Sequence, residues 1–285
     1  MSTSIKRPRA VEHDGVHVQG KKKKNIAVPP RLVEPGSFSQ IPEDTPVPVS
    51  VWENAVLLVD KPQTWTSFDV CAKIRGELAR TLNVKSKKVK VGHAGTLDPM
   101  ATGLLIVCVG KGTKSIDSFV SMKKEYSGTM KLGQETDSYD ADGNVVQEFE
   151  WKHVTNDALQ GLISERFMGN IEQFPPMFSA IRVNGKRLYE SARKGEEVER
   201  KARAITVERF DIMRDDESQP CVDFWVTCSK GTYIRSLAHD LGTSASCGAH
   251  LVALRRELIG EYNVQNAWSM DTLVQFIQSQ RDQNE

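Results

Sequence analysis

The stretch GHAGTLDPMATGLL at residues 92–105 concentrates the residue types from which a reactive loop can be built. Its glycines permit close backbone approach and φ angles that other residues avoid. Pro99 pushes the residue before it away from helical geometry, which would hold the Asp98 carboxylate on an extended loop. A carboxylate placed in this way could serve as a nucleophile or a general base. An Asp-Pro pair beside glycine is also typical of an ordinary turn, so the stretch alone leaves both interpretations open.

Apolar patterns around this loop predict a mixture of strands and helices. Strands are expected at 55–59, 104–109, 125–132, 203–213 and 221–229. Helices are expected at 68–82, where Thr66 and Ser67 form the cap, and at 155–168, 186–194, 233–245 and 270–279. Asp142-Gly143 is typical of a hairpin turn. Because no regular strand–helix–strand repeat is present, the pattern favours an α+β fold with a mixed sheet.

Composition excludes several classes of protein. The chain has 285 residues, of which 39% are hydrophobic and 26% charged, as in ordinary globular proteins. No run reaches the roughly 18 apolar residues of a membrane span. The five cysteines show no metal-ligand spacing, and an odd number without a secretory signal favours free thiols in a reducing compartment. We therefore expect no membrane contact, no disulfide and no metal site.

The formal net charge of +1 hides a segregation of charge along the chain. Residues 73–90 hold seven basic residues and one acidic residue, and residues 182–203 hold eight basic and four acidic residues. Residues 131–175 carry nine Asp or Glu against three basic residues. Such segregation can create one electropositive face that attracts a polyanion, although solvated helix faces and an acidic loop would have the same composition.

Residues 1–50 are predicted to be a disordered leader, with the folded body at 51–285. The leader is polar and rich in proline, and it carries eight basic and five acidic residues. Arg7-Pro8-Arg9 followed by Lys21 to Lys24 is similar to a two-part nuclear import signal. An RNA-gripping arm and an organellar transit peptide are equally open alternatives. The leader thus predicts a nuclear or organellar location for a eukaryotic protein and a cytoplasmic one otherwise.

Motifs in order along residues 55–260 resemble those of the TruB family of pseudouridine synthases. The stretch at 92–105 is similar to the catalytic motif of that family. The other matching segments are LVDKP at 58–62 with Thr66-Ser67, KEY at 124–126, LG at 132–133, DADG at 140–143, PPMFSA at 175–180, GKRLY at 185–189, SKGTYIRS at 229–236, CGAHL at 247–251 and LRR at 254–256.

The resemblance implies the pseudouridine synthase fold, a mixed and mainly antiparallel central sheet flanked by helices and loops, with an RNA-gripping insertion at about 175–203. It also implies that a uridine at position 55, in the T loop of tRNA, is isomerised to pseudouridine. The N-glycosidic bond breaks, the uracil turns, and the base rejoins the sugar through C5 without cofactor or metal. We expect a monomer that contacts the T arm and elbow of tRNA.

Roles carried over from the family fall on three catalytic and six substrate-binding positions. Asp98 matches the essential aspartate, Tyr126 the tyrosine that stacks on the target base, and Arg235 the arginine paired with the aspartate. His93 matches the histidine that packs among the displaced bases, and Tyr233 and Leu254 lie where the family lines the uracil pocket. Lys61, Gly95 and Thr96 are also expected to contact the substrate.

Elementary chemistry agrees with these roles. A base that must turn has to be flipped out of its stack into a pocket with aromatic and apolar walls. Stacking on Tyr126 would contribute about 1–3 kcal/mol. Breaking the glycosidic bond places positive charge on the sugar, which a carboxylate stabilises, and Arg235 would keep Asp98 ionised. Without the resemblance, His93 is more typical of a structural residue, the tyrosines of core aromatics and Arg235 of a surface ion pair.

Only 29 residues follow Arg256, too few for the PUA-type RNA-binding domain that many family members carry. Affinity for RNA is therefore expected from the catalytic domain, its basic stretches and the leader. Two other functions stay open on the sequence alone. One is a subunit of a guide-RNA ribonucleoprotein that acts on ribosomal RNA, as dyskerin-like proteins do. The other is a non-catalytic tRNA-folding chaperone on the same fold.

Overall fold

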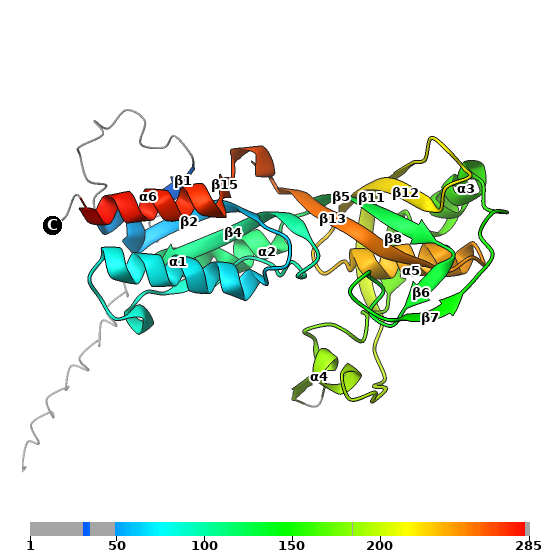
Figure 1. Cartoon of the computed structure of the whole chain (residues 1–285), viewed down its shortest axis with the longest axis horizontal. Coiled ribbons are helices and arrows are strands. Elements are labelled where there is room, and N and C mark those ends of the chain that lie inside the picture. Colours follow the sequence, from blue (N-terminus) through cyan, green and yellow to red (C-terminus); the bar gives the residue numbers. More distant parts are fainter. Residues whose placement is uncertain (1–30, 35–48, 184, 283–285) are drawn as a thin grey trace, which may run out of the picture.

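One continuous sheet organises the chain (Figure 1). The computed structural model describes residues 31–34, 49–183 and 185–282. Along the sheet the strands follow the order β1-β2-β4-β13-β5-β12-β11-β8, and β3, β14 and β15 pair beside this path. Neighbours along the path are antiparallel except β1 with β2 and β4 with β13. The expected α+β fold with a mixed, mainly antiparallel sheet is confirmed.

The strands of this sheet are β1 (Arg31–Val33), β2 (Asn54–Lys61), β3 (Val91–His93), β4 (Thr102–Gly110), β5 (Lys124–Leu132), β8 (Gly169–Gln173), β11 (Arg203–Met213), β12 (Cys221–Cys228), β13 (Ala249–Ile259), β14 (Tyr262–Asn263) and β15 (Trp268–Ser269). Two small hairpins lie outside it, β6 (Gln134–Thr136) with β7 (Val145–Glu148), and β9 (Arg182–Val183) with β10 (Lys186–Arg187). The first hairpin confirms the turn expected at Asp142-Gly143.

The α-helices are α1 (Ser67–Thr81), α2 (Ile116–Ser121), α3 (Asn156–Arg166), α4 (Leu188–Ala192), α5 (Ile234–Ser244) and α6 (Met270–Asp282). The short 3-10 helices are η1 (Val49–Glu53), η2 (Ser86–Lys88), η3 (Lys111–Ser115) and η4 (Val264–Asn266). The cap expected for α1 is confirmed, because the Asp69 amide donates to the Thr66 hydroxyl at 3.1 Å and the Thr66 amide donates to the Asp69 carboxylate at 2.9 Å.

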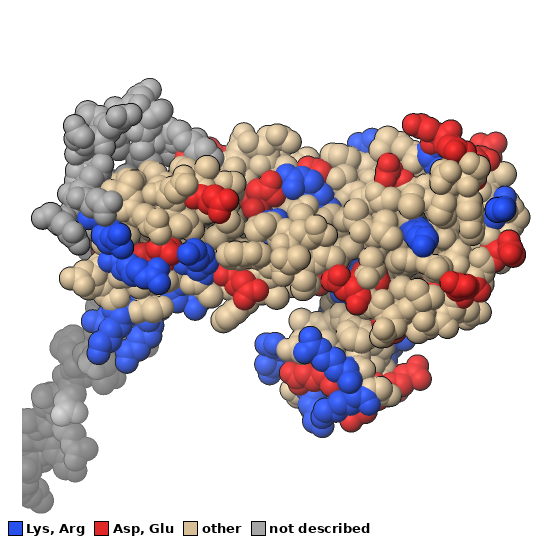
Figure 2. Space-filling view, viewed as in Figure 1, with Lys and Arg blue, Asp and Glu red and all other residues tan. Residues whose placement is uncertain are grey.

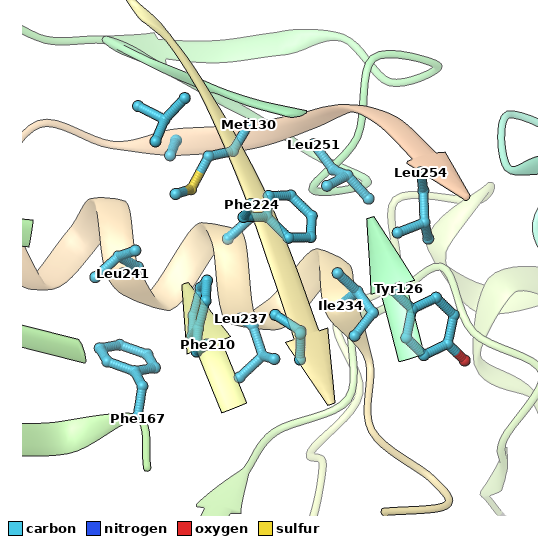
Figure 3. Close-up of a cluster of buried hydrophobic side chains, with 14 of the residues drawn as sticks. Tyr126, Met130, Phe167, Phe210, Phe224, Ile234, Leu237, Leu241, Leu251 and Leu254 are labelled. Carbon is cyan, nitrogen blue, oxygen red and sulfur yellow. The ribbon is translucent and has the colours of Figure 1, made fainter. Parts of the chain in front are cut away.

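The two halves of the sheet have separate hydrophobic cores. In the first half, α1 and α6 pack on β2 and β4 through fully buried Leu57, Leu105, Ile74 and Leu273. In the second half, α3 and α5 cover β5, β11, β12 and β13, with Phe224 near the centre of the cluster (Figure 3). The apolar runs of the sequence supply the strand residues of both cores, and burial of this area is the main force holding each half together.

Strand β13 joins the two halves, and the sequence patterns did not predict it. It pairs with β5 over Ala249–Ile259, and Arg255 and Arg256 pair in parallel with Thr102 and Gly103 of β4. Charged side chains break its apolar pattern. A Cβ on Gly103, whose φ is +99°, would lie 2.4 Å from the Arg256 carbonyl oxygen, so only glycine permits this approach of β4 to β13.

Several boundaries differ from those expected. Arg31–Val33 pairs with β2 and Val33 is fully buried, so the prediction that the disordered leader continues to residue 50 is wrong at these residues. Residues 90–100, expected as a loop, include β3, and the helix expected at 186–194 is limited to α4. The signals at residues 7–9 and 21–24 lie outside the described residues.

The described residues show the state of the cysteines and the lengths of the helices. All five cysteines are free thiols. Four are buried, and Cys221 at the start of β12 is exposed. Among the described helices, none has the length and apolar character needed to cross a membrane.

A buried carboxylate ties α1 to α6 and generates a prediction. The side chain of Glu77 is 3% exposed and accepts from Lys73 at 3.0 Å, Arg80 at 2.8 Å and Gln278 at 3.2 Å. Burial alone would raise the pKa of Glu77, but these partners together lower it from 4.5 to about 2. Because the pKa is lower in the folded state, the stabilisation is complete above about pH 5 and is lost as the pH falls from 4.5 towards 2.

We therefore expect Glu77→Gln to lower the free energy of unfolding at pH 7 by about 1.5–3 kcal/mol, the usual contribution of hydrogen bonds to a charged group. Urea unfolding at several pH values should show this difference shrinking below pH 4.5. Glu165→Gln is the matched control, since Glu165 is 69% exposed and contacts only Arg166 at 3.6 Å. A deficit for Glu77→Gln that is constant from pH 7 to pH 3 would contradict the assignment.

Candidate active site

A cavity of about 710 Å³ lies where the loop at 94–101, here called the catalytic loop, meets β5 and β13. The β6–β7 loop and the segment that leads into α5 complete its lining. Asp98, Tyr126 and Arg235, the three predicted catalytic residues, all line it. So do four predicted substrate-binding residues, which are Gly95, Thr96, Tyr233 and Leu254. Its volume is within the range typical of small-molecule sites. The structure therefore brings seven of the nine predicted site residues to one place.

Asp98 and Arg235 form an ion pair on the cavity wall, with 2.9 Å between Arg235 Nε and Asp98 Oδ2. The Arg235 side chain is 5% exposed, whereas the Asp98 side chain is 36% exposed. The guanidinium is therefore held inside the protein while the carboxylate remains accessible from the cavity. A charge-assisted hydrogen bond of this kind fixes the orientation of the carboxylate. Asp98 is thus placed to act on a ligand as a nucleophile or a base.

Arg235 also joins two other segments to the site. Its Nη1 donates to the Ser138 carbonyl at 2.8 Å and lies 3.4 Å from Asp140 Oδ2, and its Nη2 donates to the Phe178 carbonyl at 2.9 Å. Asp140 is itself buried, and burial raises its pKa although the Ser138 hydroxyl and Arg235 oppose the change. One buried guanidinium therefore fixes the catalytic loop, the β6–β7 loop and the start of the insertion at 175–203 relative to one another.

Tyr126 lies at the end of the second hydrophobic core that faces the cavity. Figure 3 shows its ring beside Leu254, with the phenolic oxygen directed away from the other labelled side chains. Burial raises the pKa of Tyr126, against the effect of a hydrogen bond with the Arg256 side chain, so the phenol is neutral at ordinary pH. The Tyr126 ring and Leu254 together form an apolar wall, and the phenolic oxygen of Tyr126 is its polar end. A flat, ring-bearing ligand fits such a wall.

Arg256 is a site residue to which the sequence analysis gave no role. It is 1% exposed, and its guanidinium donates to the carbonyls of Leu104 at 2.7 Å, Gly95 at 3.2 Å and Thr96 at 3.5 Å. It thereby connects the catalytic loop to Tyr126. The signal that could have revealed it is an arginine inside a strand-forming segment, where a buried charge must find several acceptors.

Lys61 and His93 do not line the cavity. Lys61 is fully buried, and its ammonium donates to the carbonyls of Trp65 at 2.6 Å, Pro62 at 2.9 Å and Pro99 at 3.5 Å. Burial lowers the pKa of Lys61 to about 8. The structure therefore gives Lys61 a supporting position beneath the catalytic loop, and the prediction that it contacts substrate lacks structural support.

His93 lies on β3 opposite Val107, and its Nδ1 is buried without a hydrogen-bond partner among the described residues. Burial lowers the pKa of His93, and the nearby Arg256 guanidinium lowers it further. The ring is therefore neutral at ordinary pH. Its expected contact with displaced bases would have to occur outside the cavity, on the surface beside the catalytic loop.

Tyr233 is held in the cavity by its backbone. Gln173 at the end of β8 accepts from the Tyr233 amide at 2.8 Å and donates to the Tyr233 carbonyl at 3.0 Å. Burial raises the pKa of Tyr233.

In the part of the chain that the structure describes, no group of three or more His, Cys, Asp or Glu side chains is arranged to hold a metal ion.

Comparison with known proteins identifies sequence relatives of the chain. The N-terminal domain of the TruB family pseudouridylate synthases matches residues 80–234, and the tRNA pseudouridylate synthase B C-terminal domain matches residues 235–285. The tRNA pseudouridine synthase B of Parabacteroides distasonis is 45% identical over 78% of this chain and 93% of its own length. That of Flavobacterium johnsoniae is 47% identical over 77% of this chain and 94% of its own length.

Solved structures with the same fold include larger proteins. A chain in the crystal structure of a Cbf5-Nop10-Gar1 complex matches 82% of this chain with a TM-score of 0.58 and 26% identity. A chain in an H/ACA RNP bound to a substrate RNA containing 2'-deoxyuridine matches 81% of it with a TM-score of 0.56 and 26% identity. This chain spans 61% and 55% of those two chains, respectively.

The position of Asp98 depends on two buried hydrogen bonds between Ser67 and its neighbour Leu97, and this dependence can be tested. The Ser67 hydroxyl accepts from the Leu97 amide at 2.8 Å and donates to the Leu97 carbonyl at 3.1 Å, and Ser67 is 2% exposed. Ser67→Ala leaves both backbone groups of Leu97 buried without this partner. We expect a loss of about 1–3 kcal/mol in the free energy of unfolding. Hydrogen exchange at the Leu97 amide should become faster.

Ser118→Ala is the control for this measurement. Its hydroxyl donates to the Ser115 carbonyl at 2.6 Å on the exposed side of α2, where water can replace the bond. The control should leave the exchange of Leu97 and the unfolding free energy unchanged. Unaltered protection of the Leu97 amide in Ser67→Ala would mean that the loop is held by other contacts.

Proposed function

The chain belongs to the TruB family of pseudouridylate synthases, and from that premise we propose that it converts uridine to pseudouridine in tRNA. The two relatives described above match this chain over more than nine tenths of their own length, and both carry the name tRNA pseudouridine synthase B. The observation that carries the proposal is the accessible Asp98 carboxylate, paired with a buried arginine on the wall of a cavity that Tyr126 also lines.

We further propose that the target uridine enters this cavity by base flipping. A nucleotide cannot be isomerised while its base is stacked, so it must leave the RNA and be held in a pocket. Tyr126 offers a stacking surface, and Leu254 and Tyr233 close the apolar wall. Stacking lets the uracil turn in its plane after the bond to the sugar has broken, without leaving the protein.

Asp98 acts on the sugar of the flipped nucleotide in this proposal. As the bond between the sugar C1′ and the uracil N1 breaks, positive charge develops on the sugar and is stabilised by the carboxylate. The uracil then bonds to the sugar through C5, the C5 proton leaves with the assistance of Asp98, and N1 gains a proton, so that the product is an isomer of the substrate. Arg235 keeps Asp98 oriented throughout by their charge-assisted hydrogen bond.

The finer substrate, the uridine at position 55 in the T loop of tRNA, is supported by the resemblance of the motifs. The part of the insertion around α4 protrudes from the rest of the molecule in Figure 1, and its residues Tyr189 and Arg193 line the cavity. Its exposed basic residues include Arg182, Lys186 and Arg187. Such a protrusion can contact phosphates on either side of a flipped nucleotide.

The alternative, a subunit that acts with a guide RNA, is favoured by one observation. Both structural relatives described above come from complexes named Cbf5-Nop10-Gar1 and H/ACA RNP. Purified protein and an unmodified tRNA transcript, followed by pseudouridine mapping, separate the two. Pseudouridine at position 55 without guide RNA supports the proposed function. Activity only after a guide RNA is added supports the alternative, and no activity in either case contradicts both.

The role of Asp98 predicts that Asp98→Asn abolishes formation of pseudouridine and changes the Kd for tRNA by less than a few fold. Asparagine has nearly the same shape but cannot stabilise a positive sugar or accept a proton as a carboxylate does. Pseudouridine mapping and filter binding measure the two effects. Asp157→Asn, an exposed aspartate of α3, is the control and should retain full activity. Full turnover by Asp98→Asn would exclude this mechanism.

The role of Tyr126 predicts that Tyr126→Ala abolishes catalysis while tRNA binding remains measurable. One lost stacking contact is worth about 1–3 kcal/mol, a small part of the affinity for a whole tRNA. Tyr126→Phe retains the ring and should bind tRNA as tightly as the unmodified protein. If Tyr126→Ala lost binding in proportion to activity, or if Tyr126→Phe bound as weakly, the ring would not act by stacking on the target base.

A further inference from the structure

Four lysines form an exposed surface at the end of the first half of the sheet that is distant from the cavity. Lys85, Lys87, Lys88 and Lys90, here the lysine surface, lie in and beside η2 and are all exposed. Figure 2 shows blue atoms gathered at the lower left, over the region where α1 ends and η2 follows. The chain contains no Asp or Glu between Glu77 and Asp98.

The structure separates these lysines from the other basic residues of 73–90. Lys73 and Arg80 both pair with the buried Glu77, and Arg75 donates to the Val91 carbonyl at 3.1 Å. Each of these three side chains therefore has a structural role. The ammonium groups of the four lysines, by contrast, make no hydrogen bond or ion pair with any residue in the described ranges. Their positive charge is uncompensated locally and available to a ligand.

The lysine surface is connected to the catalytic loop by short, rigid elements. Its far boundary, Lys90, precedes β3, which pairs with β4 and leads directly into the loop that carries Asp98. On the other side, α1 has 15 residues, which corresponds to about 22 Å between its two ends. Ser67 at the first end clamps Leu97, and η2 packs near the second. The surface is thus held at a fixed distance from the cavity.

We propose that the lysine surface binds backbone phosphates of the tRNA beyond its T arm while the target uridine occupies the cavity. The inference rests on the proposed function, which supplies a large polyanion anchored at the cavity. About 22 Å corresponds to about eight nucleotides along one strand of an A-form RNA duplex, whose rise is about 2.8 Å per nucleotide. A contact so far from the flipped nucleotide falls on a base-paired stem and not on the loop. Lysine ammoniums suit this role because they read charge, not sequence.

The surface also explains how a chain of net charge +1 can bind RNA. The lysine surface and the basic residues of the insertion lie along the same lower side of the molecule in Figure 2. An elongated RNA along this side would meet positive charge at both ends. Local charge of this kind attracts a polyanion irrespective of the net charge.

The experiment compares the triple variant Lys85→Gln/Lys87→Gln/Lys88→Gln with the unmodified protein. Kd is measured between about 50 and 200 mM salt for full-length tRNA and for a hairpin of the T loop and its stem alone. Each lost phosphate contact lowers the salt slope by about 1. Three lost contacts lower the slope by about 3, and the salt concentration rises about fourfold over this range. For full-length tRNA, the Kd of the unmodified protein should therefore rise by a factor about 60-fold larger than the Kd of the variant. For the hairpin the two proteins should agree.

Lys152→Gln/Arg166→Gln/Arg209→Gln, which removes three exposed charges from the other half of the sheet, is the control. It should retain the salt slope for full-length tRNA. An unchanged slope for the lysine variant, or an equal loss with the hairpin, would overturn the inference. Pseudouridine formation in the hairpin, measured in parallel, reports on the proposed function alone, so failure of one proposal is distinguishable from failure of the other.

Discussion

The burial of the Arg235 guanidinium is the constraint on which the site depends. A charged group removed from water must be surrounded by acceptors, or its desolvation would destabilise the fold by several kcal/mol. Its acceptors come from the catalytic loop, the β6–β7 loop and the insertion, which are far apart in the sequence. The hydrogen bonds of this one side chain therefore bring the three segments together around the cavity. They also leave Asp98 as the acceptor that faces the ligand.

Much of the fold follows from patterns that depend on local sequence. Runs such as Leu104–Val109 are buried on both faces of the sheet, and the capping box at Thr66 marks the start of α1, so both elements could be predicted. Strand β13 could not be, since Arg255 and Arg256 break its apolar pattern. Arg255 forms a bidentate pair with Asp60, and Arg256 donates to the carbonyls of Leu104 and Gly95, so these partners are distant in sequence. No local pattern encodes such compensation.

The site could be predicted in part for a related reason. The residues proposed to act on the substrate, Asp98, Tyr126 and Arg235, belong to compact motifs, and all three line the cavity. Residues that support them do so through backbone carbonyls, as Lys61 and Arg256 do. A carbonyl has no sequence signature, and only the three-dimensional structure shows whether a buried cation touches a ligand or the loop beneath it. Contact and support are therefore indistinguishable in a motif.

The position of β13 has a consequence for how the protein is made. Ribosomes deliver β2, β3, β4 and α1 early, and β3 pairs with residues 107–109 of β4. The edge of β4 at Thr102 and Gly103 nevertheless stays unpaired until β13 has been synthesised, and α6, which covers the same core as α1, comes later still. Contacts so distant along the chain are slow to form, and unpaired apolar strands invite aggregation meanwhile. The nascent chain must therefore carry an unfinished first half through most of translation. Chaperone demand during synthesis is expected to be concentrated on that half.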